Sequence, residues 1–230
     1  MSKTTRDTKA SKDRRLCVFA KPPEPGKVKT RLFPALKPSD AAWLYLAFLN
    51  DITQELLEGP YRLCFAWAVA PGEKLPTHGG VESEEQVGEG LGERLYNAFA
   101  AGLAESATMV IVGSDQPELE KSSVVEAFEM LEKGSEVVLG PSADGGYYLI
   151  GLRRDSLDRT LFEGIPWSTG EVLAATLERC ERSGRSHSLL AEGFDIDMPA
   201  DLDALAVRLR QASKDRCRFT RVLFEEWGRL

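Results

Sequence analysis

Short, continuous apolar runs alternate along this chain with longer segments in which apolar residues recur every three or four positions. The runs have the length of strands that are buried on both faces of a covered sheet. We therefore predict strands at residues 16–20, 62–70, 109–115, 136–141 and 147–152.

The longer segments have the periodicity of helices with one buried face. The clearest follows Ser39, which we interpret as its N-cap, and it stops at Gly59 and Pro60. Further helices are predicted at residues 122–134, from about Glu171, and from Pro199, which lies in a first helical turn. The residues expected to face inward are Leu44, Phe48, Ile52 and Leu56 in the first helix and Val125, Phe128 and Leu131 in the second.

Strands that alternate with helices indicate an α/β fold, here a three-layer sandwich with a mostly parallel central sheet. With 230 residues, 43% of them apolar, the chain can bury one substantial core. We expect a single domain at residues 14–230 after a disordered polar tail at residues 1–13. Residues 70–92 have little apolar periodicity, and we expect a long surface excursion there that borders a site.

Charge and composition narrow the classes of partner. The net charge of −7 argues against a nucleic-acid-binding surface. No apolar stretch approaches the roughly 20 residues that span a bilayer, and the first residues lack the apolar core of a signal peptide. We therefore expect a cytoplasmic protein without nucleic-acid or membrane partners. The cysteines lie far apart with no CxxC pair, which favours reduced packing residues: Cys17, Cys64, Cys180 and Cys217.

The stretch FAKPPEPGKVKTRLF, residues 19–33, is rich in proline and in cationic side chains. Proline excludes a helix interior or a central strand, so the segment must form a shaped loop. It is not a phosphate-binding P-loop, because Lys21 and Val28 occupy positions where that motif needs a glycine and a Ser or Thr. The loop is either solvated or directed at a small anion such as a nucleotide phosphate.

Three further strand ends carry candidate chemistry, because ligands of open α/β sheets bind at the carboxyl ends of the strands. Asp115 in VIVGSDQPEL either binds Mg²⁺ or Mn²⁺ or caps the next helix. The ADGG segment, residues 143–146, either forms a hairpin turn or lets a ligand approach the backbone. Asp195 and Asp197 lie on one side of an extended segment, as metal ligands or as a helix cap.

Other catalytic classes lack their signatures. The chain has no GxSxG nucleophile elbow, and its two histidines, His78 and His187, lie in polar segments, which argues against a hydrolase with a histidine base. Glu93 stands where the dinucleotide-binding fingerprint needs its last glycine.

Six motifs occur in the order typical of a known family: FAKPPEPGKVKTRL, LGERLYNAF, VIVGSDQPEL, GPSADGGYYLIGL, IPWSTGEVL and DIDMPADL. Over residues 16–205 the chain resembles small bacterial transferases of the GT-A, nucleotide-diphospho-sugar transferase fold, the radical-SAM/selenodomain-associated glycosyltransferase type, some named for arsenosugar biosynthesis. It is more distantly similar to phospholactate guanylyltransferase and to molybdenum-cofactor nucleotidyltransferases. Two positions depart from the family pattern: Gly90 stands where an Asp is usual, and Gln116 where a Cys is usual.

The resemblance implies a phosphate clamp in the proline-rich loop, with Lys27 left in solvent. The expected nucleotide-binding residues are Ala20, Lys21, Gly26, Lys29, Thr30, Arg31, Gly92, Glu93 and Arg94. Asp115 and Lys29 are expected to be catalytic, and Mg²⁺ or Mn²⁺ is expected on Asp115, Asp195 and Asp197. The expected substrate-binding residues are Asp144, Gly145, Gly146, Trp167, Ser168 and Thr169. Core packing for Trp167 and an N-cap role for Ser168 or Thr169 remain alternatives.

Three functions remain open at this point. The family favours glycosyl transfer from a nucleotide-diphosphate sugar to a small acceptor. A loop rich in lysine also suits nucleotidyl transfer from a triphosphate to a small phosphorylated acceptor, with release of pyrophosphate. The outside alternative is a nucleotide-binding module without turnover. The expected partners are the nucleotide or nucleotide sugar and the acceptor, bound by a monomer or a homodimer.

Overall fold

A seven-stranded sheet, in the order β3-β2-β1-β4-β6-β5-β7, forms the centre of the computed structural model, which describes residues 13–33 and 35–230. All neighbouring strands are parallel except that β6 runs antiparallel to β4 and β5. The expected tail at residues 1–13 lies outside the described residues except for Asp13. The strands are β1 (Arg14–Ala20), β2 (Arg62–Trp67), β3 (Glu82–Glu85), β4 (Thr108–Val112), β5 (Val137–Pro141), β6 (Tyr147–Arg153) and β7 (His187–Leu189).

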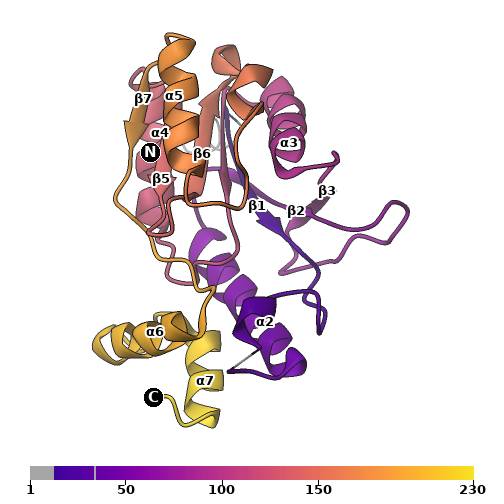
Figure 1. The fold of residues 1–230 in the computed structure, drawn as a ribbon, viewed down its shortest axis with the longest axis vertical. Helices are drawn as coiled ribbons and strands as arrows, with labels where there is room; N and C mark the ends of the chain where they lie inside the picture. The colour runs from indigo at the N-terminus through magenta and orange to yellow at the C-terminus, as the bar shows by residue number, and fades with distance from the viewer. Residues whose placement is uncertain (1–12, 34) are drawn as a thin grey trace, which may run out of the picture.

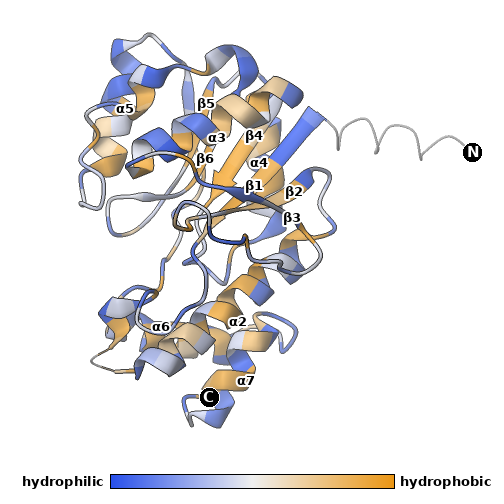
Figure 2. Ribbon diagram, turned by 90° about the vertical axis from the view of Figure 1, so that its right-hand side faces the viewer, coloured by the Kyte–Doolittle hydropathy of each residue, from blue (hydrophilic) through white to orange (hydrophobic). Residues whose placement is uncertain are grey.

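Helices cover both faces of this sheet (Figure 1). In Figure 2 the central strands β4 and β6 are mostly hydrophobic, whereas the helices carry both hydrophobic and hydrophilic residues. The predicted three-layer α/β sandwich with a mostly parallel sheet is therefore confirmed. The helices are α2 (Pro38–Leu56), α3 (Leu91–Glu105), α4 (Lys121–Glu132), α5 (Val172–Arg182), α6 (Pro199–Gln211) and α7 (Arg218–Glu226), with short 3₁₀ turns η1 (Thr30–Leu32), η2 (Arg154–Ser156) and η3 (Arg159–Phe162).

Helix α2 contains the predicted apolar face but begins earlier than predicted. All four residues expected on that face are completely buried. The N-cap is Lys37 rather than Ser39, because Pro38 opens the helix and holds the preceding residue in an extended conformation. The hydroxyl of Ser39 donates to Asp40 instead of capping the helix.

The apolar residues of the core form three clusters. One lies between the sheet and helices α2 and α4, and a second lies between the other face of the sheet and helices α3 and α5. A third is formed away from the sheet by the first half of α2 with α6 and α7, which both views show below the strands. Ile196, in the segment before α6, belongs to this third cluster and is 1% exposed.

The expected surface excursion at residues 70–92 is partly structured. It contains β3, whose sequence ESEE has no apolar residue. The apolar pattern does not predict this strand, because an edge strand with side chains in solvent needs no buried face. Helix α3 begins at the end of this excursion, at Leu91. The remainder of the excursion is irregular and leads to the carboxyl edge of the sheet.

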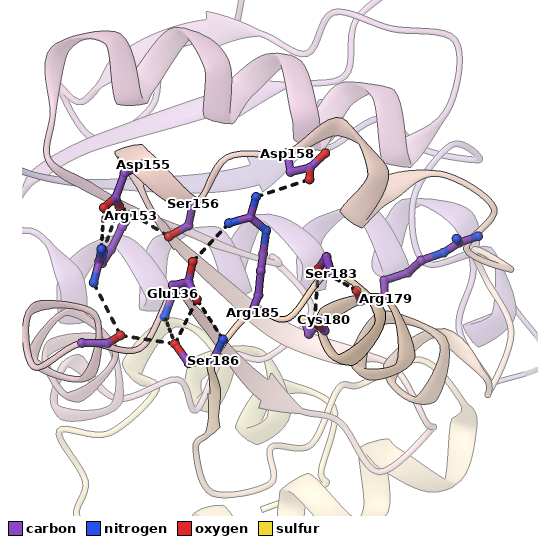
Figure 3. A network of polar contacts seen from close by, with 11 residues as sticks. Glu136, Arg153, Asp155, Ser156, Asp158, Arg179, Cys180, Ser183, Arg185 and Ser186 are labelled. Carbon is purple, nitrogen blue, oxygen red and sulfur yellow. Dashed lines mark hydrogen bonds and ion pairs between the residues drawn. The ribbon is translucent and has the colours of Figure 1, made fainter.

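The opposite, amino-terminal edge near β5 and β7 carries a polar network (Figure 3). Arg185 donates to Glu136 at 3.2 Å and to Asp158 at 3.3 Å. Glu136 in turn accepts from the amide of Ser186 at 2.9 Å. These contacts fasten β5, β7 and the turn before η3 to one another, and they lie at the far end of the strands from the candidate site.

The cysteines confirm the prediction of packing residues, since all four are buried and unpaired. Within residues 13–33 and 35–230, we find no helix with the length and apolar character needed to cross a bilayer.

Candidate active site

A cleft of about 760 Å³ opens at the carboxyl edge of the sheet. Its walls come from the loop after β1, the ends of β3 and β4, the β5–β6 hairpin, the loop before α5 and the segment before α6. The predicted site residues that line it are Ala20, Lys21, Lys29, Thr30, Arg31, Arg94, Asp115, Asp144, Gly146, Trp167, Ser168, Thr169, Asp195 and Asp197.

Four predicted residues do not line this cleft. Gly26 forms a turn at a φ of 84°, a conformation that favours glycine, and Glu93 accepts from the amide of Glu89. Gly92 lies under Trp167, where a Cβ atom would come within 2.7 Å of the indole nitrogen. Gly145 lies against Gly170, whose carbonyl oxygen would overlap a Cβ atom at this position. These glycines shape the walls rather than contact the cleft.

The loop after β1 is held in place by Tyr45, a buried residue of α2. The amide of Lys21 donates to the Tyr45 hydroxyl at 3.0 Å, and this hydroxyl shares a hydrogen bond of 2.7 Å with Ser114. The loops after β1 and β4 are thereby joined through one side chain. Lys27, expected to be solvated, is exposed and pairs with Glu24 at 2.6 Å.

Lys29 lies at the centre of the site. Its side chain is 3% exposed, and its ammonium contacts Asp115 at 2.6 Å and Asp197 at 3.1 Å. The third proton goes to the carbonyl oxygen of Ile196 at 2.6 Å. Burial lowers the pKa of Lys29, but the two carboxylates more than offset this and leave the pKa raised, so the group is charged. All three ammonium protons are therefore used within the protein.

Asp195 lies beside this cluster in a less polar setting. Burial and the charge of Asp115 raise the pKa of Asp195 to about 6, although Ser142 donates to its carboxylate at 2.8 Å. A carboxyl group with this pKa is partly protonated in mildly acidic solution. It can bind a cation or accept a proton.

The carboxylates around Lys29 are a candidate site for a divalent cation. Among the described residues, no three His, Cys, Asp or Glu side chains form a ready-made metal centre. The Asp115 and Asp197 carboxylates nevertheless share one cation, the Lys29 ammonium, which marks a point where positive charge is favourable. Mg²⁺ often takes only one or two carboxylates and completes its shell with phosphate oxygens and water. The residues fit a cation of this kind if Lys29 moves aside.

The far wall of the cleft is formed by the β5–β6 hairpin and the loop before α5. Asp144 accepts from the amide of Gly146 at 3.0 Å, so the segment is a hairpin turn as well as part of the wall. Thr169 donates to a carbonyl oxygen and accepts from the amide of Glu171, which is the helix-start role considered for it. Ser168 has a φ of 66°, a strained conformation for a residue other than glycine. Trp167 lies edge-on to Tyr147 with ring centroids 6.4 Å apart.

Several residues of the site have no signal in the sequence pattern. Tyr45 lies on an apolar helix face and resembles a packing residue, and Ser142 lies in the GPSADGGYYLIGL motif but is not among the predicted site residues. Gln86 lines the cleft and is only 8% exposed, but it follows β3, the strand that the apolar pattern does not predict.

Comparisons with known proteins identify a sequence family and several structures of the same fold. A family model described as "Uncharacterized protein conserved in bacteria (DUF2064)" matches residues 51–169. No curated protein sequence matches the chain. The crystal structure of a protein from Desulfovibrio desulfuricans G20, provisionally named a nucleotide-diphospho-sugar transferase, is 31% identical and has a TM-score of 0.88. That match covers 94% of this chain and 96% of the other.

Two more distant structures share the fold alone. CMP:2-keto-3-deoxy-manno-octonic acid synthetase, in complex with CTP, is 14% identical with a TM-score of 0.54 over 86% of this chain and 99% of the other. A cytidylyltransferase from Leptospira borgpetersenii is 11% identical with a TM-score of 0.55 over 94% and 95% of the two chains.

Proposed function

The chain belongs to the DUF2064 family and is a transferase with the nucleotide-diphospho-sugar transferase fold, and from this premise we propose that it transfers a glycosyl group from a nucleotide-diphosphate sugar to a small acceptor. We further propose that it is of the radical-SAM/selenodomain-associated type, on the strength of the six ordered motifs. The reaction joins an acceptor oxygen to the anomeric carbon and releases the nucleoside diphosphate.

The observation that carries the proposal is the group of charges at the carboxyl edge of the sheet. Asp115 and Asp197 would hold a divalent cation, with Asp195 beside them. A bound Mg²⁺ or Mn²⁺ supplies electrostatic stabilisation to a leaving diphosphate. Such a reaction needs no side-chain nucleophile, and the sequence has no GxSxG nucleophile elbow.

The cationic side chains of the cleft support binding of phosphates. All the cations of the loop and Arg94 line the cleft. Lys29 is held by Asp115 and Asp197 and Lys27 pairs with Glu24, so we propose that Lys21, Arg31 and Arg94 contact the phosphates. Arg31 also lies 3.7 Å from Asp197, so a phosphate at this point would contact the arginine next to the proposed metal ligand. Trp167 and Ser168, across the cleft, are proposed to contact the sugar or the acceptor.

Nucleotidyl transfer is the second candidate, because the same cations and carboxylates suit a triphosphate. The two reactions differ in what leaves: a nucleoside diphosphate in glycosyl transfer and pyrophosphate in nucleotidyl transfer. Three of the four loop cations, Lys27, Lys29 and Arg31, lie within ion-pair distance of a carboxylate. The cleft therefore presents less positive charge than the loop sequence indicates, which favours the diphosphate.

The deciding experiment is a screen of nucleotide sugars and nucleoside triphosphates for Mg²⁺- or Mn²⁺-dependent thermal stabilisation, followed by product analysis with the best binder. We expect a nucleotide sugar to stabilise most and to release its nucleoside diphosphate slowly. Preferential stabilisation by a triphosphate, with pyrophosphate released once an acceptor is supplied, would establish nucleotidyl transfer instead. Stabilisation by a nucleotide without any product would leave the non-catalytic binding module, and absence of stabilisation by every nucleotide would refute nucleotide binding.

A further inference from the structure

Cys17 and Cys64 lie opposite each other on neighbouring strands of the sheet. They are direct partners in the parallel register of β1 and β2. Both belong to the apolar cluster on the α3 side of the sheet, so their side chains point to the same face, and both are buried. Neighbouring strands lie about 4.7–4.9 Å apart, within the range of about 4.4–6.8 Å that separates the Cα atoms of disulfide-linked cysteines. The two thiols are therefore within reach of a disulfide bond.

An arginine and a glutamate lie next to the Cys64 thiol. Its sulfur is 4.0 Å from the Glu84 carboxylate, which forms an ion pair with Arg15. The Arg15 side chain is 5% exposed, and its Nε atom has no hydrogen-bond partner in the part of the chain that the structure describes. A buried guanidinium with an unused donor beside a thiol favours the thiolate.

The two thiols of the pair differ in acidity. A hydrogen bond from Cys17 and the nearby charge of Arg15 lower the pKa of Cys64, against the opposing effects of burial and of Glu84. The same hydrogen bond, together with burial, raises the pKa of Cys17. Cys64 is thus the better nucleophile of the two, while Cys17 keeps its proton.

Cys180 and Cys217 provide a contrast within the same chain. Burial raises the pKa of Cys180 to about 11 and that of Cys217 to about 12. The Cys217 thiol also donates to the carbonyl oxygen of Pro117 at 3.2 Å. Thiols that stay protonated are poor nucleophiles, so these two residues serve as internal controls.

Cys64 also lies near the edge of the sheet. β3 is the edge strand next to β2, and the Glu84 side chain that contacts Cys64 is 35% exposed. An oxidant that enters on this side meets the ion pair of Glu84 and Arg15 before it meets the thiol. Entry therefore requires these two side chains to move and leaves the strands paired.

We propose that Cys17 and Cys64 form a site of reversible oxidation, at which hydrogen peroxide converts the two thiols into a disulfide between β1 and β2. The Cys64 thiolate attacks one oxygen of the peroxide, the O–O bond breaks and hydroxide leaves, so that Cys64 becomes a sulfenic acid. The Cys17 sulfur then attacks the Cys64 sulfur, and the Cys17 proton leaves with the hydroxyl group as water. The peroxide takes up the two electrons that the sulfurs lose. The disulfide joins the two strands that lead to Ala20 and Ala68 at the cleft.

Oxidation of the native wild-type chain tests the proposal without a mutation. The reduced chain is treated with a small excess of hydrogen peroxide, its remaining thiols are alkylated after denaturation, and its peptides are mapped by mass spectrometry. We expect a link between Cys17 and Cys64 to form at least about tenfold faster than any oxidation of Cys180 or Cys217, and dithiothreitol to reverse it. Equal loss of all four thiols, which marks oxidation of the unfolded chain, or absence of this link would overturn the proposal.

Alanine variants assign the order of the two steps. Cys17→Ala should stop the reaction at the Cys64 sulfenic acid, which dimedone labels, whereas Cys64→Ala should leave Cys17 unlabelled. Cys180→Ala, at another buried cysteine, is the matched control and should form the disulfide at the wild-type rate. Labelling of Cys17 in Cys64→Ala that is as fast as labelling of Cys64 in Cys17→Ala would overturn the assignment of Cys64 as the nucleophile.

Discussion

Replacing Lys29 by methionine tests whether its ammonium occupies the position of the proposed metal ion. The substitution keeps the length of the side chain and removes the ammonium that contacts Asp115, Asp197 and the Ile196 carbonyl. We expect Lys29→Met to bind Mn²⁺ more tightly than the wild type when no nucleotide is present, because the metal no longer competes with the ammonium for the two carboxylates.

The magnitude follows from the contacts. Two unit charges 4 Å apart interact by about 4 kcal/mol at an effective dielectric constant of 20. The carboxylate side chains of Asp115 and Asp197 are 44% and 35% exposed, so water screens much of this energy. About 1.4 to 2.8 kcal/mol should remain, which corresponds to about 10- to 100-fold in Mn²⁺ affinity.

Electron paramagnetic resonance of free Mn²⁺ during titration measures this affinity directly. Lys27→Met is the matched control, because Lys27 is exposed and forms its ion pair with Glu24, away from Asp115 and Asp197. Adding Asp115→Asn to Lys29→Met should abolish the gain. If Lys29→Met binds Mn²⁺ no more tightly than the wild type, or more weakly, the ammonium is not occupying a metal position and the interpretation of the cluster is wrong.

Three other predictions address the pH dependence, the fold and the phosphates. The raised pKa of Asp195, about 6 against about 3.9 in an unfolded chain, means that its contribution to stability is present below pH 4 and is lost as the pH rises through 6. Without divalent metal, the free energy of unfolding of Asp195→Asn in urea should therefore rise by up to about 3 kcal/mol relative to that of the wild type between pH 4 and 7. A difference between the two proteins that stays constant over this pH range would contradict the prediction. Asp51→Ala should lower the free energy of unfolding in urea by about 2–4 kcal/mol at neutral pH. The buried Asp51 carboxylate accepts from the amide and hydroxyl of Thr220 at 2.9 and 2.6 Å and so caps α7. A loss below about 0.5 kcal/mol would show that α7 does not need this cap. Arg31→Ala should weaken binding of the best diphosphate about tenfold or more in calorimetry, with Lys27→Ala unchanged, and equal affinities for the two variants would remove Arg31 from the phosphate site.

The elements that the sequence predicts are those with a strong apolar pattern. The buried strands β1, β2, β4, β5 and β6 and the helix α2 all have continuous or periodic apolar residues. The edge strand β3 escapes prediction because its ESEE sequence has no buried face, and α7 because it follows a polar connection and is capped by Asp51 from a distant helix.

Some residues of the candidate site can be predicted from the sequence and others cannot. Asp115, Asp195 and Asp197 are predictable because carboxylates at strand ends are unusual and the sheet brings those ends together. The inward position of Lys29 depends on a φ of 48°, a backbone conformation that residue order in a proline-rich loop does not reveal. Gln86 depends on the carbonyl oxygens of two other strands, so only the assembled sheet shows which of its atoms faces the cleft.

Ile196 joins the cleft to the cluster of helices below the sheet. Its side chain is buried with α6 and α7, its amide donates to the carbonyl oxygen of Asp115 at 2.9 Å, and its carbonyl oxygen accepts from Lys29. The two aspartates that flank it are thus set by a helical unit at the C-terminal end of the chain. Helices α6 and α7 therefore support the candidate site through Ile196, and we expect changes in these helices to alter the site without contacting a ligand. Engineering of this protein by trimming its C-terminal helices would remove a support of the site rather than an appendage.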